Sequence, residues 1–205
     1  DWDDIRLPTI AAMRRKGMNA EALKLFWIEL GLTQKDISVP LSSLFSHDTK
    51  IIDIKSPRIS FVREPKSLEL VREGLPTSIT VPSHPEHSNF KPRKIDLSAK
   101  IVMVEKADLD EALSKSNKFR LKDLADVEIT EGKAIITSID SAGGLRIVHW
   151  VANGEETNLY YNEDDEIGCQ KGILEAHSHP IGTQVQLERV GYAIIEETGL
   201  VLSHN

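Results

Sequence analysis

The sequence predicts a mainly β protein that begins with a small helical unit. Apolar residues recur at helical spacing in roughly the first quarter of the chain. From Ile51 onward, short apolar runs alternate with turn residues, a pattern typical of an antiparallel sheet or barrel. The dipeptide Asn153-Gly154, between two such runs, is a strong signal for a tight hairpin turn.

Two helices are expected near the start of the chain. The first runs from Thr9 to Lys16 and stops at Gly17, a residue type that favours helix C-termini. The second begins at Asn19, whose side chain can accept hydrogen bonds from the free amides of the first turn. Its apolar residues are spaced to form one face, comprising Leu23, Phe26, Trp27 and Leu30.

Two further helical segments are expected before the strands. Thr33 to Asp36 has the sequence of a capping box and predicts a short turn. Pro40 then opens another helix, because proline is favoured in the first helical turn. The residues of this helix with helical spacing are Leu41, Leu44, Phe45, Asp48 and Ile52. The compact helical unit is expected to end near residue 47.

The strands are predicted from short apolar runs bounded by turn residues. The Pro-, His- and Lys-rich segment from His84 to Lys94 is interpreted as a loop or an inter-barrel linker. The last two strands are expected to flank a turn at Thr198-Gly199. The predicted strands are Ile59–Val62, Ser78–Val81, Ile101–Glu105, Val127–Thr130, Lys133–Ile139, Arg146–Val151, Asn158–Tyr161, Thr183–Glu188, Tyr192–Glu196 and Gly199–Ser203.

Composition indicates an ordinary globular protein without membrane spans. The chain has 205 residues, 40% hydrophobic and 28% charged, enough for one large or two small domains. A single cysteine, Cys169, excludes an internal disulfide and fits a reducing, cytoplasmic location. The net charge of −7 argues against nonspecific nucleic-acid binding but allows a local basic track. Because the chain opens at Asp1 without an initiator Met, we expect it to be a fragment.

We predict no catalytic residue and no metal site in this chain. It contains no glycine-rich phosphate loop and no nucleophile elbow. His177 and His179, with Cys169 upstream, could supply three zinc ligands, but a structural zinc site usually needs four with recognisable spacing. His84 and His87 are interpreted in the same way, as ordinary loop residues.

The basic triplet Arg14-Arg15-Lys16 has two interpretations. On composition alone, three cations at the end of a helix are best explained by favourable interaction with the helix dipole. The surrounding sequence favours a second interpretation, because the triplet lies within the pattern Asp-x-Arg-Leu-x-Thr, basic triplet, Gly. The residues of this pattern are Asp4, Arg6, Leu7, Thr9, Arg14, Arg15, Lys16 and Gly17.

This pattern resembles the start of the tRNA-binding half of class I glutamyl- and glutaminyl-tRNA synthetases, most closely the archaeal and eukaryotic glutamyl type. Ile5 stands where the family usually has proline, a departure that removes no polar group. The resemblance continues in order along the chain, in KIIDIKSPRISFV, ITVPSHPEH, FRLKDLADVEI, IVHWV and VQLERVGYA. It therefore covers nearly the whole sequence.

The resemblance implies a helical bundle followed by two antiparallel β-barrels. The helical bundle would comprise residues 1–47, the proximal barrel residues 48–94 and 180–205, and the distal barrel, which interrupts it, residues 95–179. The full-length enzyme would attach glutamate to tRNA with ATP and Mg²⁺. Its catalytic domain would lie upstream of Asp1, so this chain would hold no cofactor. The implied partner is the tRNA for glutamate, contacted at its anticodon loop and stem.

The resemblance also implies which residues contact RNA. Arg58 and Gln186 match an arginine and a glutamine that bind the middle anticodon uracil, whose edge offers acceptors and a donor. Arg120 matches an arginine that binds the first base. The basic triplet would contact the RNA backbone. Without the resemblance, a surface ion pair, a solvated strand face or an ordinary surface glutamine would explain these residues equally well.

The residue that would contact the third anticodon base stays unidentified. The family segment that supplies it is shorter here, and the nearest cations are Lys115 and Lys118. Lys118 and Lys122 flank Arg120, so we include both among the expected RNA-binding residues. Trp150 is instead expected to anchor the core of the distal barrel.

Two other functions remain open at this stage. The chain could be the same region of a glutaminyl-tRNA synthetase, because the two anticodons share a pyrimidine followed by U. It could also be a stand-alone barrel that binds ribosomal RNA or acts as a protein adaptor. The helical unit around Arg14 to Gly17 argues against a stand-alone barrel, which would not need it.

Overall fold

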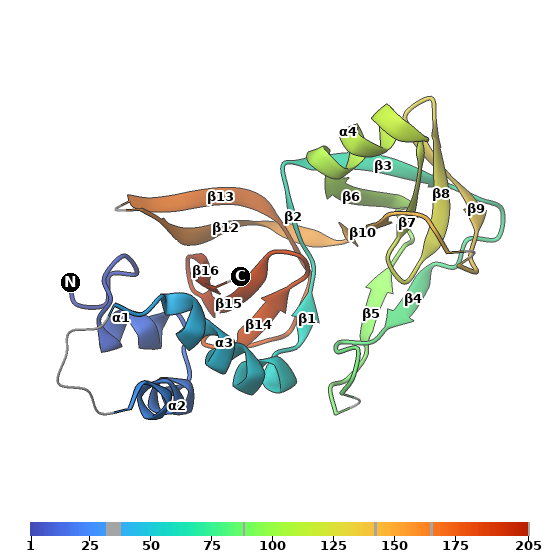
Figure 1. The fold of residues 1–205 in the computed structure, drawn as a ribbon. Helices are drawn as coiled ribbons and strands as arrows, with labels where there is room; N and C mark the ends of the chain where they lie inside the picture. Colours follow the sequence, from blue (N-terminus) through green and yellow to red (C-terminus); the bar gives the residue numbers. More distant parts are fainter. Residues whose placement is uncertain (32–37, 88, 142, 165, 205) are drawn as a thin grey trace. The chain divides into compact units, whose positions relative to one another are not determined.

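The structure, a computed structural model, describes residues 1–31, 38–87, 89–141, 143–164 and 166–204. The fold is mainly β with few helices, as expected (Figure 1). The chain forms two compact units, which we call the first and second unit. The first unit comprises Asp1–Pro57, Leu159–Cys169 and His179–Asn205, and the second comprises Arg58–Asn158 and Gln170–Ser178. The domain boundaries expected from the sequence stay a prediction.

The helices of the first unit begin where their capping residues predict. The Thr9 side chain accepts a hydrogen bond from the Ala12 amide, and the Asn19 side chain accepts one from the Glu21 amide. The third helix continues beyond residue 47 to Ile52, the last of the residues whose spacing predicts a helix. Thr33 to Asp36 lies outside the described residues. The helices are α1 (Ile10–Arg15), α2 (Ala20–Leu30), α3 (Leu41–Ile52) and the 3-10 helix η1 (Asp53–Lys55).

The buried face of α2 differs from the predicted one. Ala22 and Phe26, four residues apart, are its buried residues, and they pack with Leu44 of α3. Trp27 was expected on this face, but 62% of its surface is exposed. A residue lies about 100° around the helix from its neighbour, so burying Phe26 turns Trp27 towards solvent.

The strands of the first unit lie in the order β14-β15-β16-β12. β15 and β16 are antiparallel, with Glu196 opposite Gly199, which confirms the predicted C-terminal hairpin. The end of β12 runs parallel to β16, with Leu159 opposite Leu200. The bounds are β12 (Gly154–Glu163), β14 (Gln184–Leu187), β15 (Gly191–Glu196) and β16 (Gly199–His204).

The second unit contains a curved, barrel-like sheet with the strand order β10-β7-β8-β9-β3-β6-β11 (Figure 1). The helix α4 (Lys106–Lys115) lies against it. Four of its neighbouring pairs are antiparallel, as expected, whereas β10 is parallel to β7 and β3 is parallel to β9. The bounds are β3 (Pro65–Val71), β6 (Ile101–Glu105), β7 (Lys118–Leu121), β8 (Ala125–Thr130), β9 (Lys133–Ser138), β10 (Ile147–Val148) and β11 (Trp150–Val151).

The remaining strands of the second unit lie outside this barrel-like sheet. β4 (Ser78–Val81) pairs with β5 (Arg93–Asp96), so the segment from His84 to Lys94 is chiefly the loop of a hairpin and does not link the two units. β13 (Glu166–Glu175) pairs with β2 (Phe61–Arg63). β1 (Arg58–Ile59) completes the set.

The core of the second unit lies inside its barrel-like sheet. Trp150 is 4% exposed and its indole nitrogen donates a hydrogen bond to the Lys122 carbonyl at 2.9 Å, which confirms it as a core residue. The same core cluster contains large apolar side chains from the strands of the sheet, including Leu68, Leu70, Val102, Val104, Phe119, Leu121 and Val127.

The predicted hairpin at Asn153-Gly154 was wrong. β11, before this dipeptide, pairs with β6, and β12, after it, pairs with β16. β11 has only two residues, too few for a hairpin arm, so the turn redirects the chain to another sheet. Among the described residues, no helix is long and apolar enough to cross a membrane.

Candidate nucleic-acid interface

The basic triplet ends α1 and continues into a tight turn at Gly17, and we call Arg14 to Gly17 the basic turn. Arg14 is exposed and Lys16 is partly buried. Arg15 forms a bidentate ion pair with Glu196 of β15, with N–O distances of 2.9 and 3.0 Å. The hydrogen bonds that Arg15 donates to Glu196 raise the pKa of Arg15, whereas burial lowers the pKa of Lys16.

The sheet of the first unit holds the backbone of the basic turn. The Ser203 hydroxyl donates to the Lys16 carbonyl, and the Gln184 side-chain amide donates to the Gly17 carbonyl at 3.0 Å. Gly17 has a φ of +82°, and a Cβ there would lie 2.4 Å from Cδ1 of Ile194. Only glycine satisfies both the left-handed conformation and this close approach.

A buried carboxylate joins the start of α2 to the last strand. Asp48 of α3 is fully buried and accepts a hydrogen bond from the Asn19 amide at 2.8 Å. Its other oxygen lies 2.9 Å from Nε2 of His204 in β16. The His204 ring stacks on Phe45, with ring centroids 5.0 Å apart. These contacts fix the chain on both sides of the basic turn.

The two residues expected to bind the middle base lie on short strands. Arg58 begins β1 and is partly buried, and its amide donates to the Ser83 carbonyl at 2.7 Å. Gln186 lies on β14 between the buried residues Val185 and Leu187, so its side chain points away from the core as the alternation predicted. Its amide donates to the Pro57 carbonyl at 2.9 Å.

The strand β7 places each expected cation opposite a carboxylate of β8. Lys118 and Arg120 lie on one face of β7, because they alternate with buried Phe119 and Leu121. The antiparallel register sets Lys118 opposite Glu128 and Arg120 opposite Asp126. Such cross-strand pairs stabilise a sheet.

The resulting ion pairs differ in burial. Arg120 lies 2.7 Å from Asp126, with the two side chains 16% and 7% exposed, and also donates to the Ile139 carbonyl at 3.1 Å. Lys118 lies 3.5 Å from Glu128 and both are about half exposed. Lys122 is partly buried, and its backbone carbonyl accepts the hydrogen bond from the Trp150 indole. An RNA base that reaches Arg120 therefore meets a guanidinium already held by the protein.

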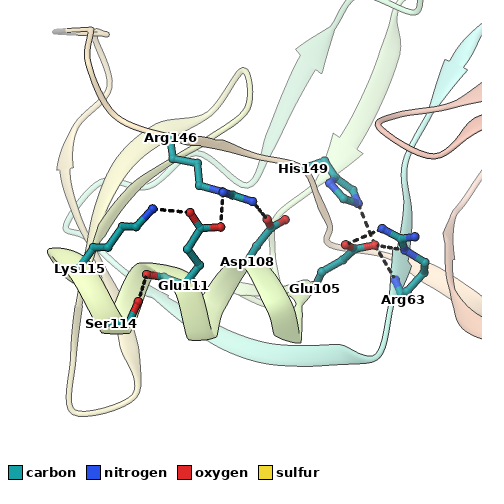
Figure 2. Close-up of polar contacts among 8 residues, drawn as sticks. All are labelled: Arg63, Glu105, Asp108, Glu111, Ser114, Lys115, Arg146 and His149. Carbon is teal, nitrogen blue, oxygen red and sulfur yellow. Dashed lines mark hydrogen bonds and ion pairs between the residues drawn. The ribbon is translucent and has the colours of Figure 1, made fainter.

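A basic residue that sequence reasoning missed lies beside α4. Arg146 donates to Asp108 at 2.5 Å and also to Glu111, both on α4 (Figure 2). Lys115, on the next turn of the helix, donates to Glu111 at 2.6 Å. The segment that carries Arg146 reaches this place because it runs alongside β7, where its carbonyl accepts from the Arg120 amide at 2.8 Å. No pattern in the sequence predicts this parallel pairing.

A second ion-pair cluster lies in the second unit at the start of α4. Glu105, which precedes α4, accepts two hydrogen bonds from the Arg63 guanidinium, at 2.6 and 3.1 Å (Figure 2). His149 is buried beside them, and its Nε2 lies 3.1 Å from the Phe61 carbonyl. These groups connect β2, β6 and the segment before β11. We interpret them as structural.

The described residues contain no cluster of three or more His, Cys, Asp or Glu side chains that could hold a metal ion. Cys169 is an exposed free thiol. His84 lies against His87, with ring centroids 4.5 Å apart, and its Nδ1 accepts from the Glu86 and His87 amides. His84 therefore organises its own loop.

Comparison with known proteins gives one consistent result. Residues 56–141 match the family described as tRNA synthetases class I (E and Q), anti-codon binding domain. The chain is 37% identical to a glutamate–tRNA ligase of Pyrococcus abyssi over 208 residues, which cover 96% of the chain. It is 36% identical to that of Methanosarcina mazei and 35% identical to that of Pyrococcus horikoshii, each over 95% of the chain.

The chain spans about a third of the length of these relatives, 36%, 34% and 36% respectively. The match extends beyond the anticodon-binding segment to the helices of the first unit, because it covers nearly all of the chain. The chain therefore belongs to the class I tRNA synthetases for glutamate and glutamine, and its residues 56–141 correspond to their anticodon-binding domain.

Proposed function

We propose that this chain is the tRNA-binding region of a glutamyl-tRNA synthetase and that it contacts the anticodon loop and stem of the tRNA for glutamate. The observation that carries the proposal is the match of nearly the whole chain to archaeal glutamate–tRNA ligases. Specific RNA recognition commonly targets splayed loop bases, which polar side chains on strands can contact at their edges. Arg58 on β1 and Gln186 on β14, both partly buried, are side chains of that kind.

The proposed architecture is a helical bundle of residues 1–47, a proximal barrel of residues 48–94 and 180–205, and a distal barrel of residues 95–179. The curved sheet around Trp150 supports a barrel in the second half of the chain. The return of the last strands to the unit that contains α1 to α3 supports an interrupted arrangement.

The rest of the enzyme would supply the chemistry. We place aminoacylation, with ATP and Mg²⁺, in a catalytic domain of the same polypeptide outside this chain, and we place the enzyme in the cytoplasm. The residues of this chain would bind and orient the tRNA. Lys118 and Lys122 would assist Arg120 at the first anticodon base, and the basic turn would contact backbone phosphates.

The test is binding of full-length enzyme variants to the tRNA for glutamate and to a version whose middle U is changed. If Arg58 contacts that base, Arg58→Ala should cost about 1–3 kcal/mol with the normal tRNA and much less with the altered one. Arg58→Lys should lose nearly as much, because an ammonium lacks the planar fork of a guanidinium. Arg72, an exposed arginine in the same unit, provides the matched control.

Other variants separate contacts to the anticodon bases from contacts to the RNA backbone. Arg120→Ala should relax preference at the first base, although part of its effect will come from the lost pair with Asp126. Arg15→Ala should weaken both tRNAs alike and reduce the dependence on salt, because phosphate contacts carry no sequence information. Equal losses for the normal and altered tRNA with Arg58→Ala would contradict the role of Arg58 as a reader.

The same region of a glutaminyl-tRNA synthetase is the second candidate, because the matching family covers both amino acids. Aminoacylation assays of the full-length enzyme with both tRNAs decide between them. Charging of only the tRNA for glutamine would replace the glutamyl assignment.

A further inference from the structure

A cavity opens in the second unit between the last turn of α4, the start of β7 and the segment before β10. Its volume is about 280 Å³. The charged residues of its wall are Lys115, Lys118, Arg146 and Glu111. Gly144 lies at its rim, and a Cβ there would meet no atom within 4 Å, so the entrance has room.

The cations of this cavity are held by carboxylates of unequal burial. Arg146 pairs with Asp108, which is 2% exposed, and with Glu111, which is 34% exposed. Glu111 also accepts from Lys115, so one partly exposed carboxylate holds two cations (Figure 2). Lys118 pairs with Glu128, on β8.

We propose that this cavity binds one phosphate group of the RNA backbone and that Glu111 occupies the place of that phosphate in the free protein. The inference rests on the proposed function, and it adds a contact point and an exchange step. A backbone phosphate carries one negative charge on two non-bridging oxygens, as a carboxylate does, so it can take the place of Glu111 beside the guanidinium of Arg146 and the ammonium groups of the two lysines.

Glu111 is the carboxylate that can leave. Asp108 is buried and keeps Arg146 in position, whereas Glu111 lies one turn further along α4 and can rotate into solvent. Hydrogen bonding from Lys115 is the main cause that lowers the pKa of Glu111, so this side chain is an anion at neutral pH and competes directly with a phosphate. Breaking an exposed ion pair costs little, which keeps the exchange reversible.

The helix itself opposes an anion at this place. The last turn of an α-helix carries partial negative charge from its free carbonyl groups. The three cations of the cavity oppose this partial charge, but in the free protein they are balanced by the three carboxylates of Asp108, Glu111 and Glu128. This balance predicts that removing the charge of Glu111 strengthens binding.

The first experiment measures the affinity of the full-length enzyme for an anticodon stem-loop RNA. Glu111→Gln should tighten binding about two- to fivefold, the range expected for relief of an exposed ion pair. Glu69→Gln is the matched control, because Glu69 is an exposed glutamate of the same unit that pairs with Lys133 at 2.9 Å. This control should leave the affinity within experimental error of wild type.

The second experiment tests the cations. Lys115→Gln and Lys118→Gln should each weaken binding and reduce the slope of log affinity against log salt, and the double variant should reduce that slope by about 0.7, the value for one single-strand phosphate contact. Lys133→Gln should change neither quantity. These exposed lysines are used instead of Arg146, because loss of Arg146 would leave Asp108 buried beside an empty space.

The outcomes separate the two proposals. If wild-type enzyme does not bind the stem-loop RNA, both the proposed function and the cavity proposal are overturned. If wild type binds but Glu111→Gln and Glu69→Gln behave alike, the cavity proposal alone is overturned. Tighter binding by Glu111→Gln together with weaker binding by Lys115→Gln supports it.

Discussion

The basic turn of the first unit and the cavity beside α4 both display cations near the end of a helix, but they are held differently. The basic turn has one side-chain ion pair, between Arg15 and Glu196, and its other described contacts are made to the backbone. At the basic turn, Ser203 and Gln184 bind backbone carbonyls and Asp48 binds a backbone amide. Beside α4, the contacts are ion pairs of the charged groups themselves, between Lys115 and the carboxylate of Glu111 and between Arg146 and the carboxylate of Asp108.

This difference separates two tasks of a polar contact. Backbone contacts fix the path of the chain and leave the charge of Arg14 exposed to a ligand. Side-chain ion pairs fix the charged groups and neutralise them until another anion replaces a carboxylate. We therefore expect loss of the backbone contacts at the basic turn to act mainly on stability, and loss of the ion pairs beside α4 to act mainly on charge.

The largest contrast should come from two buried aspartates. Asp48→Ala should lower the free energy of unfolding by about 3–5 kcal/mol, because it leaves His204 and the Asn19 amide buried without their acceptor. Asp108→Ala should cost only about 1–2 kcal/mol, since Arg146 is 39% exposed and keeps Glu111 as a partner. Urea unfolding of both variants measures the difference, and equal losses would break the comparison.

An intermediate contrast should come from two glycines with positive φ. Gly17→Ala and Gly144→Ala should both pay about 1–2 kcal/mol for the left-handed conformation. Gly17→Ala should lose a further 1–3 kcal/mol, roughly, because its new methyl group overlaps Ile194. Thermal unfolding compares them. The double variant Gly17→Ala with Ile194→Val should recover part of the extra loss, and no recovery would contradict the overlap.

The smallest contrast should come from two lysines with opposite pH behaviour. Burial lowers the pKa of Lys16, so its charge opposes folding at neutral pH, and this penalty disappears as pH rises through the lowered pKa towards 10.5. The hydrogen bond to Asp110 raises the pKa of Lys106, so its contribution is present below 10.5 and disappears above it.

Urea unfolding over this alkaline range, with Lys16→Met and Lys106→Met as references, gives each contribution as a difference from wild type. The stability of wild type relative to Lys16→Met should rise with pH. Relative to Lys106→Met it should fall. Slopes of the same sign would show that the two lysines do not have the opposed environments described above.

Local signals in the sequence were sufficient for the helices of the first unit and for most strands. Thr9 and Asn19 act through side chains that reach amides two or three residues away, so the sequence alone contains both partners. The terminal hairpin was equally local. α4 was missed because its buried residues include only Asp108 and Ala112, so it has no apolar stripe to detect.

The sequence failed where distant segments decide the outcome. β3 begins with a proline and carries charges at exposed positions, and it is a strand because β6 and β9 flank it. The dipeptide Asn153-Gly154 locally favours a hairpin. The actual partner of β11 is β6, which lies far away in the sequence, so the local signal was misleading.

The candidate site shows the same limit. The expected cations could be named from the family pattern, but their carboxylate partners could not. Asp126 meets Arg120 through strand register, and Arg146 meets α4 through a parallel pairing with β7. These partners matter because they determine how much of each positive charge a nucleic acid can use.

The pairing of Asp48 with His204 has a consequence for how the protein is made. A ribosome adds roughly 5–20 residues per second, so the 156 positions between these partners take roughly 8–30 s to translate. During that interval the Ala22–Phe26 stripe and α3 have left the ribosome while the last strand does not yet exist. The nascent helices are therefore where a chaperone would bind, and the second unit, most of which is continuous in sequence, can fold before them.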